Sequence, residues 1–146
     1  MQTKEILMEL RQKFGLTQEQ LAQKLFVTRQ AVSRWENGET TPNTETLKQL
    51  SRLYHVSINT LLGSPQQLFC QCCGMPLDDG LISWELDGTP NEEYCKYCYQ
   101  DAAFTYPTTE SLVEYLLAHA TPEGVEKETA RAWYTQQLST LRHWRK

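Results

Sequence analysis

The sequence predicts a mainly α-helical protein: five short helices come first, then a small cysteine-rich ribbon with a short β-hairpin, then further helices. Apolar residues recur at helical spacing up to residue 63. All five cysteines fall between positions 70 and 98, where the apolar pattern becomes short and irregular. Helical spacing returns after Pro107. The domains we expect are residues 1–63, 68–106 and 107–146, with residues 64–67 as a linker.

The overall composition is that of a folded chain. Of the 146 residues, 40% are hydrophobic and 22% are charged, which argues against a disordered protein. No apolar run approaches the roughly 20 residues that are needed to span a bilayer. Residues 1–5 lead into an amphipathic pattern rather than a solid apolar stretch, so no signal peptide is visible. The expected location is therefore the cytoplasm.

Charge is divided unevenly along the chain. The net charge is −4, but residues 1–63 hold eight Lys/Arg and six Asp/Glu, a balance of +2. Residues 64–146 hold six Lys/Arg and twelve Asp/Glu, a balance of −6. This asymmetry suggests that the first part meets phosphate and the second does not. Because the positive surplus is small, strong non-specific binding to nucleic acid is not implied.

Capping residues mark the first two helices. Thr3 can cap a helix that continues to Phe14 and ends at Gly15. Thr17 opens the second helix, since residues 17–20 fit the S/T-x-x-E/Q capping box. Its expected inner face consists of Leu21, Ala22 and Leu25.

Three more helices follow in the same way. After a break at Phe26-Val27, Thr28 caps a third helix that runs to about Asn37 and ends at Gly38. A fourth starts at Pro42-Asn43. A short fifth helix follows over residues 58–62. Such a domain is near the small end of what folds alone.

The third helix has a polar side suited to reading DNA. Val32 and Trp35 face inward, which leaves four polar residues outward: Arg29, Gln30, Ser33 and Arg34. A helix fits the major groove, where arginine can pair with guanine and glutamine with adenine, each pairing worth roughly 1–3 kcal/mol of discrimination. Gln18, at the start of the second helix, is placed for a phosphate contact.

Residues 1–63, and VTRQAVSRWENGETTP in particular, resemble the helix-turn-helix domain of phage-repressor-like (XRE/Cro-type) transcription regulators. The resemblance implies a homodimer that binds a palindromic operator, with half-sites about one turn of DNA apart. It also implies an ion pair between Arg11 and Glu36, and backbone contacts from the loop after the third helix. The expected DNA-contacting residues are Gln18, Thr28, Arg29, Gln30, Ser33, Arg34, Asn37, Thr40 and Thr41.

Phe26 departs from the pattern of this family, in which the turn position is commonly glycine. A positive φ is often needed there, and a bulky residue in that conformation is costly. We therefore expect either a slightly different turn or compensation of Phe26 by packing.

The cysteines form two C-x2-C pairs, Cys70/Cys73 and Cys95/Cys98, separated by 21 residues. Two such pairs can complete a tetrahedron around Zn²⁺, and four thiolates leave no open position for catalysis, so the expected role is structural. Residues 81–86 alternate well enough for a strand of the hairpin between them. Rubredoxin-like iron and thiol–disulfide switching are the alternatives. Cys72 is left over, either as a small side chain beside the site or as a redox-sensitive thiol.

The cysteine segment, over about residues 70–107, also resembles a zinc-ribbon family that is found attached to bacterial helix-turn-helix domains. This resemblance supports Cys70, Cys73, Cys95 and Cys98 as the ligands.

Beyond the ribbon, Thr108 or Thr109 caps one helix, and Thr121-Pro122-Glu123 marks the start of another with proline in its first turn. The continuation of this helix has an apolar face that we expect to lie in the protein core, in a dimer seam or at an effector pocket. The face consists of Trp133, Tyr134, Leu138, Leu141 and Trp144.

Three functions remain open at this point. The leading hypothesis is a transcription regulator that occupies a palindromic operator. The second is an antitoxin-like protein whose acidic C-terminal half binds a partner protein. The third is a metal or redox sensor in which occupancy of the cysteine site changes DNA affinity. The sequence holds no Ser/His/Asp or Cys/His arrangement, no phosphate loop and no open metal site, so no catalytic residue is expected.

Overall fold

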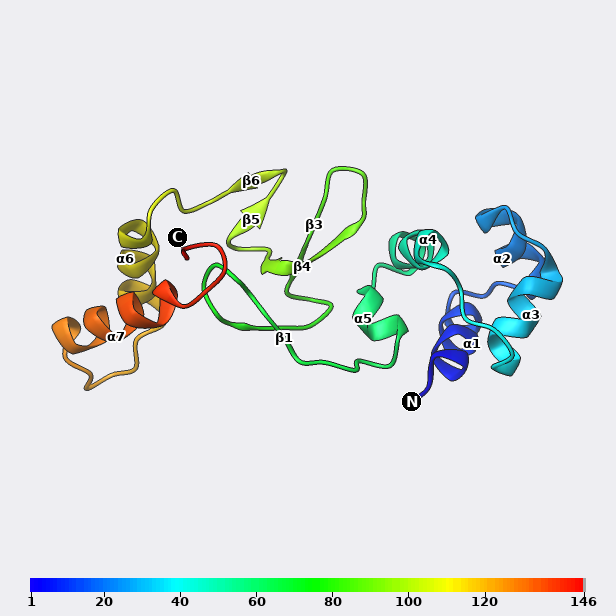
Figure 1. Ribbon diagram of the computed structural model, residues 1–146, viewed down its shortest axis with the longest axis horizontal. Helices are drawn as coiled ribbons and strands as arrows, with labels where there is room; N and C mark the ends of the chain where they lie inside the picture. The colour runs from blue at the N-terminus through cyan, green and yellow to red at the C-terminus, as the bar shows by residue number, and fades with distance from the viewer. Residues whose placement is uncertain (146) are drawn as a thin grey trace. The chain divides into compact units, whose positions relative to one another are not determined.

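In the computed structural model, which describes residues 1–145, the chain divides into two compact units. The first unit comprises Met1–Gln67 together with Asp87–Pro90, and the second comprises Leu68–Leu86 and Asn91–Lys146. Helices fill the first unit, while the second combines short strand pairs with two helices (Figure 1). This arrangement confirms the predicted fold class. Within residues 1–145, no helix is long and apolar enough to cross a membrane.

The first unit holds five helices: α1 (Thr3–Lys13), α2 (Gln18–Leu25), α3 (Arg29–Asn37), α4 (Thr44–Tyr54) and α5 (Ile58–Leu61). The predicted caps of α2 and α3 are confirmed. The Thr17 hydroxyl accepts the Gln20 N–H at 3.0 Å, and the Thr28 hydroxyl accepts the Ala31 N–H at 3.1 Å. The predicted cap of α1 is wrong, because Thr3 is already helical and Gln2 is the N-cap.

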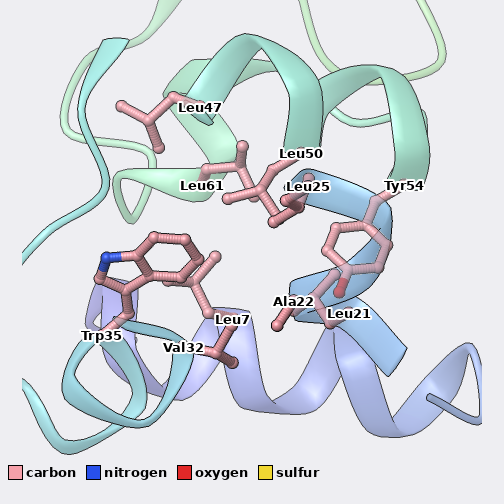
Figure 2. Packing of buried hydrophobic residues seen from close by; sticks show 10 residues of the cluster. All are labelled: Leu7, Leu21, Ala22, Leu25, Val32, Trp35, Leu47, Leu50, Tyr54 and Leu61. Carbon is pink, nitrogen blue, oxygen red and sulfur yellow. The ribbon is translucent and has the colours of Figure 1, made fainter. Parts of the chain in front are cut away.

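One apolar cluster holds these helices together, and every helix contributes to it (Figure 2). Trp35 of α3 and Leu7 of α1 both belong to this cluster, and α4 supplies Leu47, Leu50 and Tyr54. The remaining members are Leu21, Ala22, Leu25, Val32 and Leu61. Burying a leucine side chain contributes about 1.5–3 kcal/mol, so this cluster is the main source of stability for a domain of this size.

The turn between α2 and α3 takes the left-handed conformation, with Phe26 at φ 57° and ψ 42°. Val27 donates its N–H to the Ala22 carbonyl at 3.0 Å, which fixes the turn. The Phe26 side chain is 93% exposed. Both predicted ways of accommodating Phe26 are therefore wrong: the turn keeps its positive φ, and packing does not compensate the aromatic ring. Such a residue costs on the order of 1–3 kcal/mol.

Three strand pairs follow the first five helices: β1 (Leu68–Phe69) with β2 (Pro76–Leu77), β3 (Ile82–Trp84) with β4 (Pro90–Cys95), and β5 (Tyr99–Gln100) with β6 (Ala103–Phe104). Apart from Pro90, all of these residues belong to the second unit. Leu68 lies opposite Leu77, and Tyr99 lies opposite Phe104. The strand predicted at residues 81–86 is present but shorter, and it pairs as expected in a hairpin.

Two helices complete this unit, α6 (Thr109–His119) and α7 (Lys127–Ser139). Thr108 caps α6, as predicted. The start predicted for α7 at Thr121-Pro122-Glu123 is wrong, because Gly124 takes φ 86° and the helix begins only after Glu126. A positive φ is incompatible with a continuous right-handed helix.

The C-terminal helices pack against the cysteine segment. Leu112, Val113 and Leu138 belong to the same buried cluster as four of the cysteines. Tyr134, Leu141 and Trp144 are partly buried against this cluster, whereas Trp133 is 56% exposed. The predicted apolar face is thus mostly intramolecular core.

Candidate functional site

The outward face of α3 is polar and accessible. Arg29, Gln30 and Arg34 are exposed, and Ser33 is half-buried. On the opposite side, Val32 and Trp35 are buried in the apolar cluster (Figure 2). The structure therefore brings the predicted base-contacting residues together on one face. Because the helix is anchored by its buried side, this face is presented rigidly.

An ion pair fixes α3 to α1. Arg11 donates Nε to Glu36 Oε2 at 2.8 Å and Nη2 to Glu36 Oε1 at 2.9 Å, which confirms the pair that the resemblance implies. This hydrogen-bonded carboxylate raises the pKa of Arg11. A third donor group of Arg11 bonds the Leu16 carbonyl at 2.9 Å. The bidentate geometry is the strong form of an arginine–carboxylate contact.

The ion pair extends by hydrogen bonds to the surface of α3. Gln18 donates from Nε2 to Glu36 Oε1 at 3.5 Å, and its Oε1 accepts Arg29 Nη1 at 3.4 Å. Gln18 is the first residue of α2 and remains half-buried. A buried carboxylate is thus connected through Gln18 to an exposed arginine of the predicted reading face.

The other predicted contacts lie at the two ends of α3. Thr28 is exposed at the N-cap. Asn37 is exposed in the last turn and donates from Nδ2 to Ser33 Oγ at 3.4 Å. Thr40 and Thr41 are exposed in the loop that follows.

The second candidate site is a cluster of four thiols in the second unit. The Sγ atoms of Cys70, Cys73, Cys95 and Cys98 all lie within 4.8 Å of one another. Cys70, Cys95 and Cys98 are buried, while Cys73 is half-buried. All five cysteines of the chain are free thiols. The two C-x2-C pairs therefore meet at one point, which is the arrangement that a tetrahedral metal site requires.

Backbone N–H groups surround Cys70 Sγ. Those of Cys72 and Cys73 lie 3.4 Å away, and that of Cys95 lies 3.2 Å away. Gly74, at φ 84°, completes the first turn and donates its N–H to the Cys70 carbonyl at 2.8 Å. Donors pointing at sulfur stabilise a thiolate, which is the form of cysteine that binds metal.

The four thiols also act on one another. Hydrogen bonds with the thiols of Cys73, Cys95 and Cys98 lower the pKa of Cys70 well below its ordinary value. The hydrogen bond with Cys70 raises the pKa of Cys98. The thiols and backbone N–H groups around Cys70 thus favour its thiolate form. A metal ion would supply the positive charge that four adjacent thiolates need, and the donor set fits Zn²⁺.

Residues 141–145, here called the C-terminal strap, close over the first cysteine pair. Trp144 donates its Nε1–H to the Cys72 carbonyl at 2.7 Å, and His143 donates its N–H to the Gln71 carbonyl at 3.1 Å. Arg142 forms an ion pair with Glu93 of β4, two residues before Cys95. Sequence reasoning missed this role of the strap, because its partners lie 49 to 72 residues away and leave no local pattern.

Cys72, the fifth cysteine, is buried and belongs to the same cluster as the ribbon's leucines. Its thiol packs inside the unit, so the structure favours a small side chain beside the site.

Two family models match the chain. One described as "Putative zinc ribbon domain" covers residues 69–145, and one described as "Helix-turn-helix" covers residues 7–61. The first match extends through the C-terminal strap, beyond the cysteine segment itself.

Three proteins are similar to parts of the chain. The HTH-type transcriptional activator BcrR of Enterococcus faecalis is 46% identical over 66 residues, which are 45% of this chain and 32% of that protein. The HTH-type transcriptional regulator ImmR of Bacillus subtilis (strain 168) is 43% identical over 60 residues, 41% of this chain and 47% of that protein. A crystal structure of a transcriptional regulator from Listeria innocua matches with 35% identity and a TM-score of 0.43, over 47% of this chain and 64% of that one. The chain thus spans about a third of the length of the first relative and about half of the length of the second.

Proposed function

The chain belongs to the zinc ribbon domain family, with a helix-turn-helix domain ahead of the ribbon, and we propose that it is a sequence-specific DNA-binding regulator of transcription. DNA reading is assigned to residues 1–63, and the ribbon with its C-terminal helices forms a second, metal-stabilised part. Named transcriptional regulators among the relatives support this function.

The observation that carries the proposal is the outward face of α3. Its polar side chains stand on a helix whose other side is buried and whose end is held to α1 by the Arg11–Glu36 pair. A helix presented in this way fits the major groove, with its N-terminal residues on base edges. Arg29 and Arg34 are suited to guanine, and Gln30 is suited to adenine.

Contacts with the DNA backbone come from both ends of this face. Gln18 and Thr28 lie at the starts of α2 and α3, where free N–H groups and the helix dipoles favour phosphate. Asn37, Thr40 and Thr41 lie at the other end. Such contacts position the protein on the duplex without specifying sequence. A homodimer would place two of these faces on half-sites about one turn apart.

The four-thiol cluster is proposed to hold structural Zn²⁺ through Cys70, Cys73, Cys95 and Cys98. Four thiolate ligands fill a tetrahedral shell, so the ion would stabilise the fold rather than activate water. A closed shell of this kind leaves no open position for a substrate, which supports a structural rather than a catalytic role for the ion.

The test compares two matched glutamine variants on a selected operator. Gln30→Ala should relax specificity at one base position by about 1–3 kcal/mol. Gln12→Ala, at an exposed position of α1, should bind as the parent protein does. Fluorescence anisotropy against the operator and its single-base variants gives both values. If Gln30→Ala and the parent discriminate equally among all the variants, α3 is not the reading helix.

A further inference from the structure

The turn before the reading helix holds an aromatic residue in an unfavourable backbone conformation, and no packing within the chain compensates for it. Phe26 takes φ 57° at the end of α2, in the left-handed region that disfavours residues with a side chain. Its ring is 93% exposed, so the rest of the chain gives it almost no packing. Residues held in such conformations cluster at active sites, ligand clamps and switch regions.

The position of Phe26 along the chain indicates which complex. Phe26 lies two residues before Thr28, the N-cap of α3, and three before Arg29. When the N-terminus of α3 enters the major groove and α2 crosses the DNA backbone, the turn that joins them lies at the wall of the groove. The rest of the turn is fixed by Val27, whose N–H bonds the Ala22 carbonyl and whose side chain packs on the core. The ring of Phe26 is therefore left to reach outward, two residues before the exposed Thr28.

The charge around the turn favours DNA over a protein partner. From residue 20 to residue 35 the chain has three cationic side chains, Lys24, Arg29 and Arg34, and no carboxylate. All three are exposed. A second copy of this surface would be repelled by like charge, whereas a polyanion is attracted.

We propose that Phe26 is a DNA contact that packs against an apolar part of the operator at the groove wall. The apolar groups available there are the C5-methyl of thymine and the carbon atoms of deoxyribose, and phenylalanine is one of the residues that suit the thymine methyl. The contact would add affinity and, when it is made to thymine, base preference. This inference rests on the proposed function.

The test uses the fact that glycine is the residue best suited to this backbone. Phe26→Gly relieves the left-handed strain and removes the ring, and Phe26→Asn does the same with a polar side chain that tolerates the conformation. Both variants should melt at the same temperature as the parent or higher. Their Kd for the selected operator should nevertheless rise, by about tenfold for the loss of one base-edge contact.

His55 supplies the matched control. It ends α4 in the same left-handed conformation, at φ 55°, and is exposed, but it lies outside the reading face. His55→Gly relieves the same kind of backbone strain, so it should leave the Kd for DNA unchanged. Equal operator affinity of the parent and Phe26→Gly would overturn the proposal. A difference in solution mass between the parent and Phe26→Gly, measured by sedimentation, would also overturn it, because the ring would then mediate contact between protein copies.

Operators in which deoxyuridine replaces single thymines separate the two DNA groups. A methyl contact predicts that one such replacement weakens the parent protein and leaves Phe26→Gly unaffected. A sugar contact predicts that each replacement of thymine by deoxyuridine affects the parent and Phe26→Gly equally. Phe26→Gly should still bind every operator more weakly than the parent does. If Gln30→Ala alters base preference while both Phe26 variants bind as the parent does, the inference about Phe26 fails and the proposed function stands.

Discussion

Arg11 of α1 and Glu36 of α3 form a bidentate ion pair whose carboxylate is almost completely buried, with Glu36 at 1% and Arg11 at 14% side-chain exposure. The same carboxylate accepts a hydrogen bond from Gln18, which in turn accepts one from Arg29 on the proposed reading face. One buried group therefore joins three helices at the point where α3 must be held at a fixed angle.

Removal of either partner should be strongly destabilising. Arg11→Ala leaves a buried carboxylate without its counter-ion, and breaking such a pair costs about 3–5 kcal/mol. Lys48→Ala is the matched control, because Lys48 forms an exposed ion pair with Glu45, three residues earlier on α4. The distance from Lys48 Nζ to Glu45 Oε1 is 3.5 Å. This substitution should cost no more than about 0.5 kcal/mol. Urea unfolding followed by circular dichroism measures both, and equal costs for the two variants would contradict the structural role of the buried pair.

Tyr54 predicts an alkaline loss of stability. Its hydroxyl is buried and has no hydrogen-bond partner among residues 1–145, and burial raises the pKa of Tyr54 to about 12 from an ordinary value of 10. Because the unfolded chain ionises first, the stability is fully present below pH 10 and declines between pH 10 and about 12.

Tyr54→Phe removes this hydroxyl. At pH 7 the variant should be as stable as the parent or about 1 kcal/mol more stable, since a buried unpaired hydroxyl is unfavourable. Between pH 10 and 12 the variant should lose less stability than the parent. Denaturant midpoints across this range test both statements. A clear loss of stability at pH 7 would mean that the hydroxyl has a favourable role in the core.

Metal removal should act on one unit only. We expect a chelator to unfold residues 68–104 and to leave the helices of residues 1–63 folded, because zinc binding contributes on the order of 10–16 kcal/mol in small zinc peptides. Amide exchange of the two segments before and after chelation measures this difference. Loss of protection in both units would refute it.

Substitution of single cysteines distinguishes ligands from the spare thiol. Cys98→Ser should lower the metal content or loosen binding, and Cys72→Ala should retain one ion per chain and the tetrahedral thiolate spectrum of Co²⁺. Elemental analysis together with Co²⁺ absorption provides the measurement. A Cys72→Ala protein without metal would show that the ligand set is different.

The C-terminal strap should slow metal release. Trp144→Phe keeps an aromatic ring but loses the bond from Nε1 to the Cys72 carbonyl, which is 2.7 Å in the parent. One hydrogen bond of about 0.5–1.5 kcal/mol corresponds to release faster by about two- to tenfold. Trp133→Phe, at a side chain that is 56% exposed, should release metal at the parental rate. Transfer of the ion to a chromophoric chelator gives the rates, and identical rates for the two variants would exclude a role for the strap.

Local patterns predicted much of this fold because their physical causes are local. Thr17 and Thr28 cap helices through bonds three residues away, and Val32 and Trp35 alternate with the polar side of the same helix. The strand pairs β1–β2 and β5–β6 have only two residues per strand, which is too short for any periodicity to register. The four thiols meet because two C-x2-C turns face each other, and the spacing alone indicated this.

The errors arose where a local rule met a competing constraint. Proline at a first helical position predicted a start at Pro122, but the left-handed Gly124 delays the helix to Lys127. The sequence could not predict whether the Phe26 side chain is exposed, because its exposure depends on what surrounds the turn in space. The bond between Trp144 and Cys72 spans 72 residues, so it follows from tertiary packing alone.

The most direct test of DNA reading by α3 is selection of bound DNA from a random duplex pool by the 146-residue chain, with and without chelator. We expect one enriched motif, in two related halves about one helical turn apart, at physiological salt. Its base preference should change with Gln30→Ala and not with Gln12→Ala. Recovery of no motif by a folded, metal-loaded protein, or of a motif that is indifferent to Gln30, would contradict the assignment of α3 as a DNA-reading helix.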